Sequence, residues 1–291
     1  MSTETHAAPS GLPGPAADEH PWIENRRATG WRPRIGLAEL WAFRELLTAL
    51  ATKTLRVRYK QTLFGVSWAV LQPVLAVIVF SVVFGRLADL PADGMPYPVF
   101  NYAAMILWLY VSSSVAAAAQ SLVESRDLLT KVFFPRLVAP LAAVVPGLVD
   151  LAIAFVVLVA LLVVYGVLPT IAVLLTPAWV VAAIAVGIAF GIPLAALNVR
   201  FRDVRHALPL LLQVWLFASP VVYASSLVEG GWRYVYAVNP MVTVLDGFRW
   251  SVAAGPAPGP ESLVSLGVVL VVLAVGLAYF RRAEQVFADV V

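Results

Sequence analysis

The chain has 291 residues, of which 61% are hydrophobic and only 13% are charged, with a formal net charge of +3. A soluble domain carries about 25% charged residues, so this composition indicates a membrane protein. There are no cysteines, which excludes disulfides, thiol nucleophiles and zinc or iron–sulfur centres held by thiolates.

The N-terminal part of the chain is the most polar. Residues 1–36 contain no apolar core of the kind found in a cleaved signal peptide, and we expect them to form a mobile cytoplasmic tail. From residue 37 to residue 60, apolar residues recur at helical spacing among basic ones. This segment is too charged to cross a bilayer and predicts an amphipathic helix in the cytoplasmic interface. A juxtamembrane helix that only anchors the protein explains the same pattern.

Long apolar stretches follow, and the core of a bilayer requires about 20 helical residues per span. Residues 137–199 are too many for one span, and we divide them at the turn after Tyr165, before Pro169 and Pro177. The sequence thus predicts an all-α integral membrane protein whose membrane-spanning domain covers residues 61–291. Its six transmembrane helices are 61–85, 97–123, 141–165, 177–197, 207–228 and 262–280.

The basic residues predict the orientation of these spans. Of the 20 arginines and lysines, 17 fall in the N-terminal region, the second and fourth loops and the C-terminal tail, while Arg86, Arg233 and Arg249 fall on the other side. Basic loops resist translocation, so we expect both termini in the cytoplasm.

The fifth loop, residues 229–261, is expected outside the cell, yet it is mostly apolar or aromatic. Asn239-Pro240 and Gly255-Pro256 interrupt it, and it is too short to cross the bilayer twice. A re-entrant helical hairpin that enters the outer leaflet explains this pattern. An aromatic segment resting on the outer interface explains it equally well.

Motifs for catalysis are absent from the sequence. No glycine precedes any lysine, so there is no phosphate-binding P-loop. The three histidines, His6, His20 and His206, lack metal-ligand spacing, and we expect no metal site. Asp150 is the one acid inside a span, where a carboxylate is either a proton or cation relay or a hydrogen-bonded structural group. A structural role is favoured because the spans offer no second acid or base.

Small residues recur every four positions in the fourth predicted span, at Ala183, Gly187, Gly191 and Ala195. Such a ridge allows two helices to approach closely. We expect it to pack inside one bundle, in preference to forming a seam between two copies.

Three stretches carry a family resemblance: VRYKQTLFGVSWAVLQP at 57–73, SRDLLTKVFFPRLVAP at 125–140 and LNVRFRDVRHALP at 197–209. Together with six spans and the aromatic fifth loop, they resemble the permease subunits of ABC exporters for polysaccharides. That family includes exporters of O-antigen, teichoic acid and capsule-type glycans. The resemblance begins near Leu37, and residues 1–36 depart from the pattern.

This resemblance implies a transport subunit that is not itself an enzyme and holds no cofactor. Two copies would form the channel, and two separate ABC subunits would bind ATP and magnesium. The substrate would be a polyprenyl-linked polysaccharide, and the site of action the cytoplasmic (inner) membrane of a bacterium, among membrane lipids and without nucleic acid. An ABC exporter of drugs or lipids, an ion-coupled secondary transporter using Asp150 and a membrane-embedded transferase are the alternatives.

The resemblance also implies roles for cytoplasmic residues. The second cytoplasmic loop would dock into the ATPase subunit through Glu124, Arg126, Asp127, Leu128, Leu129 and Lys131. Arg56, Arg58 and Lys60 would meet the pyrophosphate of the lipid carrier, since arginine forks suit phosphate oxygens. Attraction to anionic headgroups accounts for the same cluster.

Aromatic residues complete the candidate sites. Four of them are candidates to stack on sugar rings in the channel: Phe64, Trp68, Trp215 and Tyr223. They do not share one helical face, so ordinary packing is the alternative. The resemblance places an outer gate in the fifth loop, at Tyr234, Tyr236, Asn239, Pro240 and Trp250.

Overall fold

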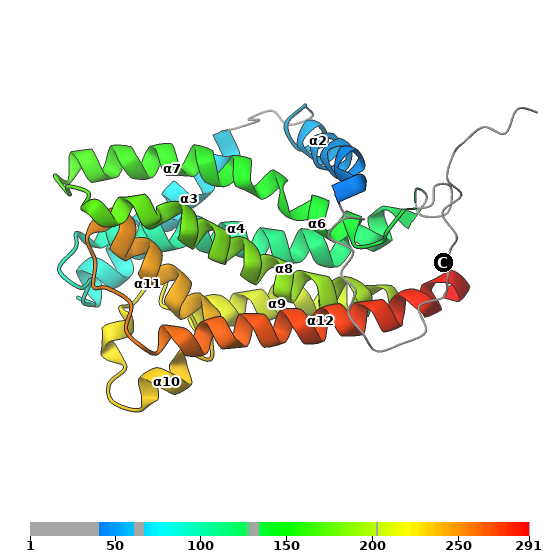
Figure 1. The fold of residues 1–291 in the computed structure, drawn as a ribbon. Coiled ribbons are helices and arrows are strands. Elements are labelled where there is room, and N and C mark those ends of the chain that lie inside the picture. Colours follow the sequence, from blue (N-terminus) through cyan, green and yellow to red (C-terminus); the bar gives the residue numbers. More distant parts are fainter. Residues whose placement is uncertain (1–40, 61–66, 127, 129–133, 202, 291) are drawn as a thin grey trace, which may run out of the picture. The chain divides into compact units, whose positions relative to one another are not determined.

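The computed structural model describes residues 41–60, 67–126, 128, 134–201 and 203–290 (Figure 1). The expected tail, the first residues of the interfacial helix and Phe64 lie outside this part of the chain. Within the described residues every regular element is a helix, which confirms the all-α class. In chain order the elements are α2 (Arg44–Lys60), α3 (Ser67–Phe80), η1 (Ser81–Leu87), α4 (Tyr97–Glu124), α6 (Val138–Val144), α7 (Pro146–Val164), η2 (Ile171–Leu175), α8 (Thr176–Arg200), α9 (Val204–Phe217), η3 (Ser225–Leu227), α10 (Trp232–Tyr236), α11 (Pro240–Ala253) and α12 (Ser262–Val290).

In the part of the chain that the structure describes, five helical stretches are long and apolar enough to cross a membrane: Val70–Leu87, Tyr97–Glu124, Val138–Val164, Ile171–Arg200 and Ser262–Glu284. They correspond to the first four predicted spans and the last. Three of them are composite, because α3 continues into η1, α6 passes into α7 at Val145, and η2 leads into α8. Pro146 begins α7, where its missing N–H would have had no partner within the helix.

The fifth predicted span differs from the structure. Helix α9 ends at Phe217 and has 14 residues, which gives a length of about 21 Å, less than the roughly 30 Å core of a bilayer. The prediction of one helix to Val228 is wrong because Pro220 offers no N–H and disfavours helical geometry at Ser219. Residues 218–223 form turns and bends instead.

Helix α4 forms the centre of the fold (Figure 1). In the most apolar 18-residue stretch of its span, 72% of the residues are buried, against 11–44% in the corresponding stretches of the other four. Its most extensive partner is α8, where a Cβ on Gly191 would lie 2.6 Å from the Cβ of Ala118, and one on Gly187 would lie 3.2 Å from that of Ser114. The ridge of small residues therefore packs inside the bundle, as the sequence predicted.

Two short helices form in the fifth loop. The side chains of α10 are mostly exposed, whereas α11 is largely buried and packs against α4, α8 and α12. Ala254 takes a left-handed conformation with φ of 55° and ends α11. Helix α10 and the turn after α7 lie at the same end of the bundle, opposite the C-terminal end of α12 (Figure 1).

Candidate functional site

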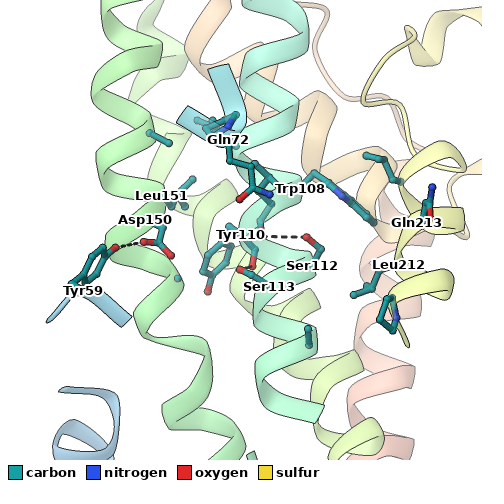
Figure 2. Close-up of a pocket in the computed structure, with 18 residues that line it drawn as sticks. Tyr59, Gln72, Trp108, Tyr110, Ser112, Ser113, Asp150, Leu151, Leu212 and Gln213 are labelled. Carbon is teal, nitrogen blue, oxygen red and sulfur yellow. Dashed lines mark hydrogen bonds between the residues drawn. The ribbon is translucent and has the colours of Figure 1, made fainter. Parts of the chain in front are cut away.

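A pocket of about 580 Å³ lies among α3, α4, α7 and α9, with the end of α2 at one side (Figure 2). Much of its lining is apolar, from residues such as Ile106, Leu151 and Leu216. Polar side chains reach it from all five helices: Tyr59, Gln72, Ser112, Ser113, Asp150 and Gln213.

The polar groups of this pocket are mostly uncharged. Ser112 and Ser113 donate hydrogen bonds to the backbone oxygens of Leu109 and Tyr110, at 3.2 and 3.0 Å, and their hydroxyl oxygens remain able to accept. The exposed side chains of Gln72 and Gln213 add amide donors and acceptors. Amides and hydroxyls in an apolar wall suit a ligand rich in hydroxyl groups.

Asp150 lies in α7 at the edge of the pocket. Its carboxylate accepts a hydrogen bond from the phenol of Tyr59 in the last turn of α2 (Figure 2). The intramembrane acid therefore binds a residue of another helix, which is what a structural role requires.

The predicted basic cluster occupies the C-terminal half of α2. Arg56 and Lys60 are exposed, and both are close in sequence to Tyr59 of the pocket. The side chain of Arg58 lies outside the described part.

The predicted coupling residues begin at the end of α4. Glu124 is its last residue and, like Arg126, is exposed. Leu128 is half-buried, and its N–H donates to the oxygen of Ser125 at 3.0 Å. Asp127, Leu129 and Lys131 fall outside the described residues.

The described channel aromatics contact the predicted outer gate. Trp215 packs edge-to-face on Trp108, with ring centroids 5.5 Å apart, and its indole N–H donates to Asn239 at 2.8 Å. The hydroxyls of Tyr223 and Tyr236 lie 2.8 Å apart. The lining of the pocket includes neither Trp215 nor Tyr223, and the side chain of Trp68 is not described.

The remaining gate residues belong to α10 and α11. Tyr234 is exposed, whereas Trp250 is half-buried. Asn239 caps α11 by accepting from the N–H of Met241 at 3.1 Å, and Pro240 follows as the first helical residue.

Arg249 is a further polar residue that the sequence placed only among the external basic residues. It is 2% exposed. Burial lowers the pKa of Arg249 to about 10, although the carboxylates of Asp246 and Asp93 oppose this shift. Burial likewise raises the pKa of Asp246 against the effect of Arg249. Arg249 therefore stays charged near neutral pH. In the sequence, Arg249 could have been noticed as the single basic residue within the mostly apolar segment that forms α11.

Comparison with known proteins gives the family. Residues 45–252 match the family described as ABC-2 type transporter. The chain is 32% identical over 255 residues to the O-antigen export system permease protein RfbA of Myxococcus xanthus, covering 86% of this chain and 97% of that protein. It is 26% identical over 251 residues to the protein of the same name from Klebsiella pneumoniae, covering 84% and 95% of the two chains.

A third relative is named for the transport of polysialic acid. The polysialic acid transport protein KpsM of Escherichia coli is 24% identical over 247 residues, covering 81% of this chain and 93% of the relative. Since the matched family region takes up more than half of the sequence, the chain belongs to the ABC-2 type transporter family.

Proposed function

We propose that this chain is the membrane-spanning permease subunit of an ATP-driven exporter that moves a polyprenyl-linked polysaccharide, such as an O-antigen, across the cytoplasmic membrane. The observation that carries the proposal is the pocket of about 580 Å³, with amide and hydroxyl groups from four helices and the carboxylate of Asp150 from a fifth. The names of the related permeases agree with it.

The pocket supports transport because polar groups are costly inside membrane helices and are kept there for a purpose. Its hydroxyl and amide groups can exchange hydrogen bonds with successive sugars. A pocket of this size is typical of a site for one small ligand, whereas a polymer needs a continuous path. One copy therefore provides one wall, and a second copy completes the channel.

Energy comes from two ATP-binding subunits, since the chain has no P-loop of its own. The loop that contains Leu128 would dock on them at the cytoplasmic face. The basic residues Arg56 and Lys60, both exposed on α2, would attract the pyrophosphate of the lipid carrier near the pocket.

The proposed topology has six crossings, of which α9 is the short fifth one. If α9 did not cross, Arg281 and Arg282 would lie outside the cell, against the preference of basic segments for the cytoplasm. Helices α10 and α11 would then form the re-entrant hairpin, with both termini in the cytoplasm.

Single cysteines test this topology, because the chain has none. An impermeant maleimide applied to intact cells should label Leu227→Cys and Gly255→Cys but not Arg126→Cys. Protection of Leu227→Cys, with labelling after the cells are opened, would show that α9 does not cross. External labelling of Arg126→Cys would contradict the orientation.

Transport itself is tested in vesicles that contain the purified permease, the ATPase subunit and a short polyprenyl-linked oligosaccharide. We expect ATP-dependent movement of the oligosaccharide only when both proteins are present. ATP turnover by this chain alone, or movement without ATP, would contradict the proposed function.

A further inference from the structure

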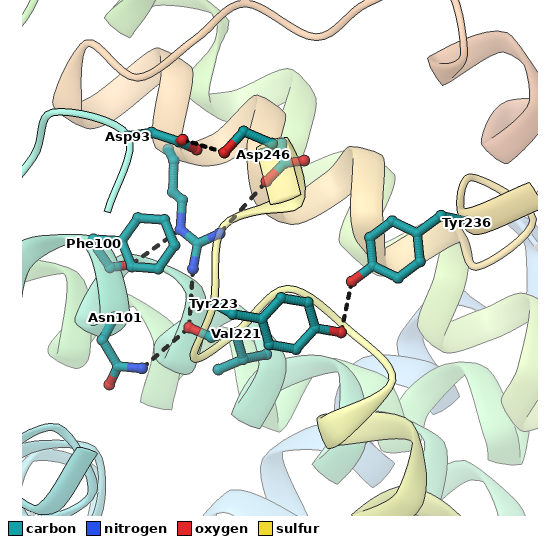
Figure 3. A network of polar contacts seen from close by, with 9 residues as sticks. Asp93, Phe100, Asn101, Val221, Tyr223, Tyr236 and Asp246 are labelled. Atoms are coloured by element: carbon teal, nitrogen blue, oxygen red, sulfur yellow. Dashed lines mark hydrogen bonds and ion pairs between the residues drawn. The ribbon is translucent and has the colours of Figure 1, made fainter. Parts of the chain in front are cut away.

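The guanidinium of Arg249 in α11 binds two other segments of the chain, α4 and the turn after α9, and a carboxylate of its own helix (Figure 3). Its Nε donates to the oxygen of Phe100 in α4 at 3.0 Å, and its Nη2 donates to the oxygen of Val221 at 3.0 Å. The Nη1 lies 3.4 Å from the Asp246 carboxylate. The guanidinium carbon also lies 3.6 Å from the centre of the Phe100 ring. One buried cation thus joins α4, α11 and the turn after α9.

The turn after α9 is bound from α4 as well. The amide of Asn101 donates to the same oxygen of Val221 at 3.1 Å, so this oxygen accepts from two helices (Figure 3). The phenol of Tyr97 donates to the oxygen of the next residue, Val222, at 2.5 Å. Backbone oxygens of a buried turn need such donors because no water can replace them.

The same turn is tied to the start of α11 and to α10. Asn239 accepts from the indole of Trp215 in α9 and donates to the oxygen of Ala218 at 3.0 Å. Tyr236 of α10 lies within hydrogen-bond distance of Tyr223 in the turn. The outer end of α9, a helix that lines the pocket, is therefore held from three directions.

We propose that Arg249 is a latch that holds the outer end of the export path closed. This inference rests on the proposed function and adds a residue that positions the gate without touching the substrate. Helix α9 cannot move away from α4 at its outer end while Arg249 binds both Phe100 and Val221. A charged donor suits this role, because its bonds are strong when buried and water can replace them once the gate opens.

The latch is tested with a cysteine in the pocket wall. Ser112→Cys serves as the reporter, in the assembled complex with the ATPase subunit and without added ATP. An impermeant maleimide is applied to intact cells. We expect Arg249→Met to raise the labelling rate about tenfold, the effect of losing one hydrogen-bonded charge. Arg249→Lys, which keeps the charge but not the forked donors, should give a smaller rise.

Arg233→Met is the matched control. Arg233 lies in α10 on the same side of the molecule, is exposed, and donates to the oxygen of Val228 at 2.9 Å. It is not part of the latch, so the labelling of Ser112→Cys should stay at the unmodified rate. A second reporter, Ala183→Cys, lies at a fully buried position between α8 and its neighbours. An equal rise at this reporter would mean general loosening and would overturn the latch.

Two further variants keep the test decisive if Arg249→Met does not assemble. Asn101→Leu and Tyr97→Phe leave Arg249 in place and remove the donors that α4 provides to the turn. Each should raise the labelling of Ser112→Cys less than Arg249→Met does. An unchanged rate of Ser112→Cys labelling in the assembled Arg249→Met complex would overturn the latch. If that complex is not obtained, an unchanged labelling rate in both Asn101→Leu and Tyr97→Phe would overturn it. Loss of ATP-driven export in the unmodified complex would reject the proposed function and not the latch.

Discussion

The phenol of Tyr59 donates a hydrogen bond to the carboxylate of Asp150, 91 residues further along the chain. This contact joins the last turn of α2 to α7, and both side chains line the polar pocket (Figure 2). Helix α2 also packs against α6. A displacement of α2 would therefore also move α7, which forms part of the pocket wall.

Replacing Tyr59 with Phe removes the donor and keeps the ring. We expect the free energy of unfolding to fall by about 1 kcal/mol, the net contribution of one hydrogen bond. Thermal unfolding of the purified protein in detergent measures this loss. Tyr165→Phe, at the exposed end of α7, is the control and should leave the melting temperature unchanged. An unchanged melting temperature for Tyr59→Phe would show that the contact adds no stability.

Replacing Asp150 with Asn keeps its size and its ability to accept from Tyr59. If Asp150 is structural, export should be largely retained and should continue with ATP after a protonophore collapses the proton gradient. The measurement is the export rate in cells with and without the protonophore. A relay carboxylate must exchange a proton or cation, which the amide cannot do. Complete loss of export in an Asp150→Asn variant that assembles normally would therefore favour the relay. If export by the unmodified protein also stopped when the proton gradient collapsed, ion-coupled transport would be favoured.

Replacing Leu128 and Leu129 with Asp should weaken docking of the ATPase subunit by more than about tenfold. The proposed docking loop would place apolar side chains against a partner surface, and an interface centre does not tolerate unpaired charge. Co-purification of the ATPase with a tagged permease measures the effect. Leu168→Asp, at an 81% exposed position in the turn after α7, is the control. Equal recovery with the double variant would indicate that the loop is only a linker.

Replacing Gly191 with Ala should destabilise the bundle by about 1–3 kcal/mol, the usual effect of overpacking. The new methyl would lie 2.6 Å from the Cβ of Ala118, on a neighbouring helix. A Cβ on Gly267 of α12 would meet nothing within 4 Å, so Gly267→Ala should be neutral or slightly stabilising. Thermal unfolding compares the two variants. Equal melting temperatures would contradict the close approach of α4 and α8.

The sequence was sufficient for the local features of this protein. Each long helix follows from a run of apolar residues, and α4 begins at Tyr97 and ends one residue beyond its predicted end at Val123. The packing of Gly191 inside the bundle was also predictable, because its spacing to the other small residues is a property of one helix. The family followed from three short stretches.

The tertiary structure decided what depends on contacts between distant residues. Composition placed a span over residues 207–228. Pro220 is a local reason for the end of α9, but the donors on α4 and α11 that stabilise the turn after it are not revealed by any local pattern. The sequence predicted Arg249 only as a basic residue of an external loop. In the structure its side chain is buried and donates hydrogen bonds to Phe100 and Val221. Asp150 could be recognised as unusual, yet its partner Tyr59 belongs to a helix far away in sequence. Hydrophobic periodicity is a property of consecutive residues and can be read from the sequence. The pairing of polar groups depends on which helices pack together, and this is known only from the tertiary structure.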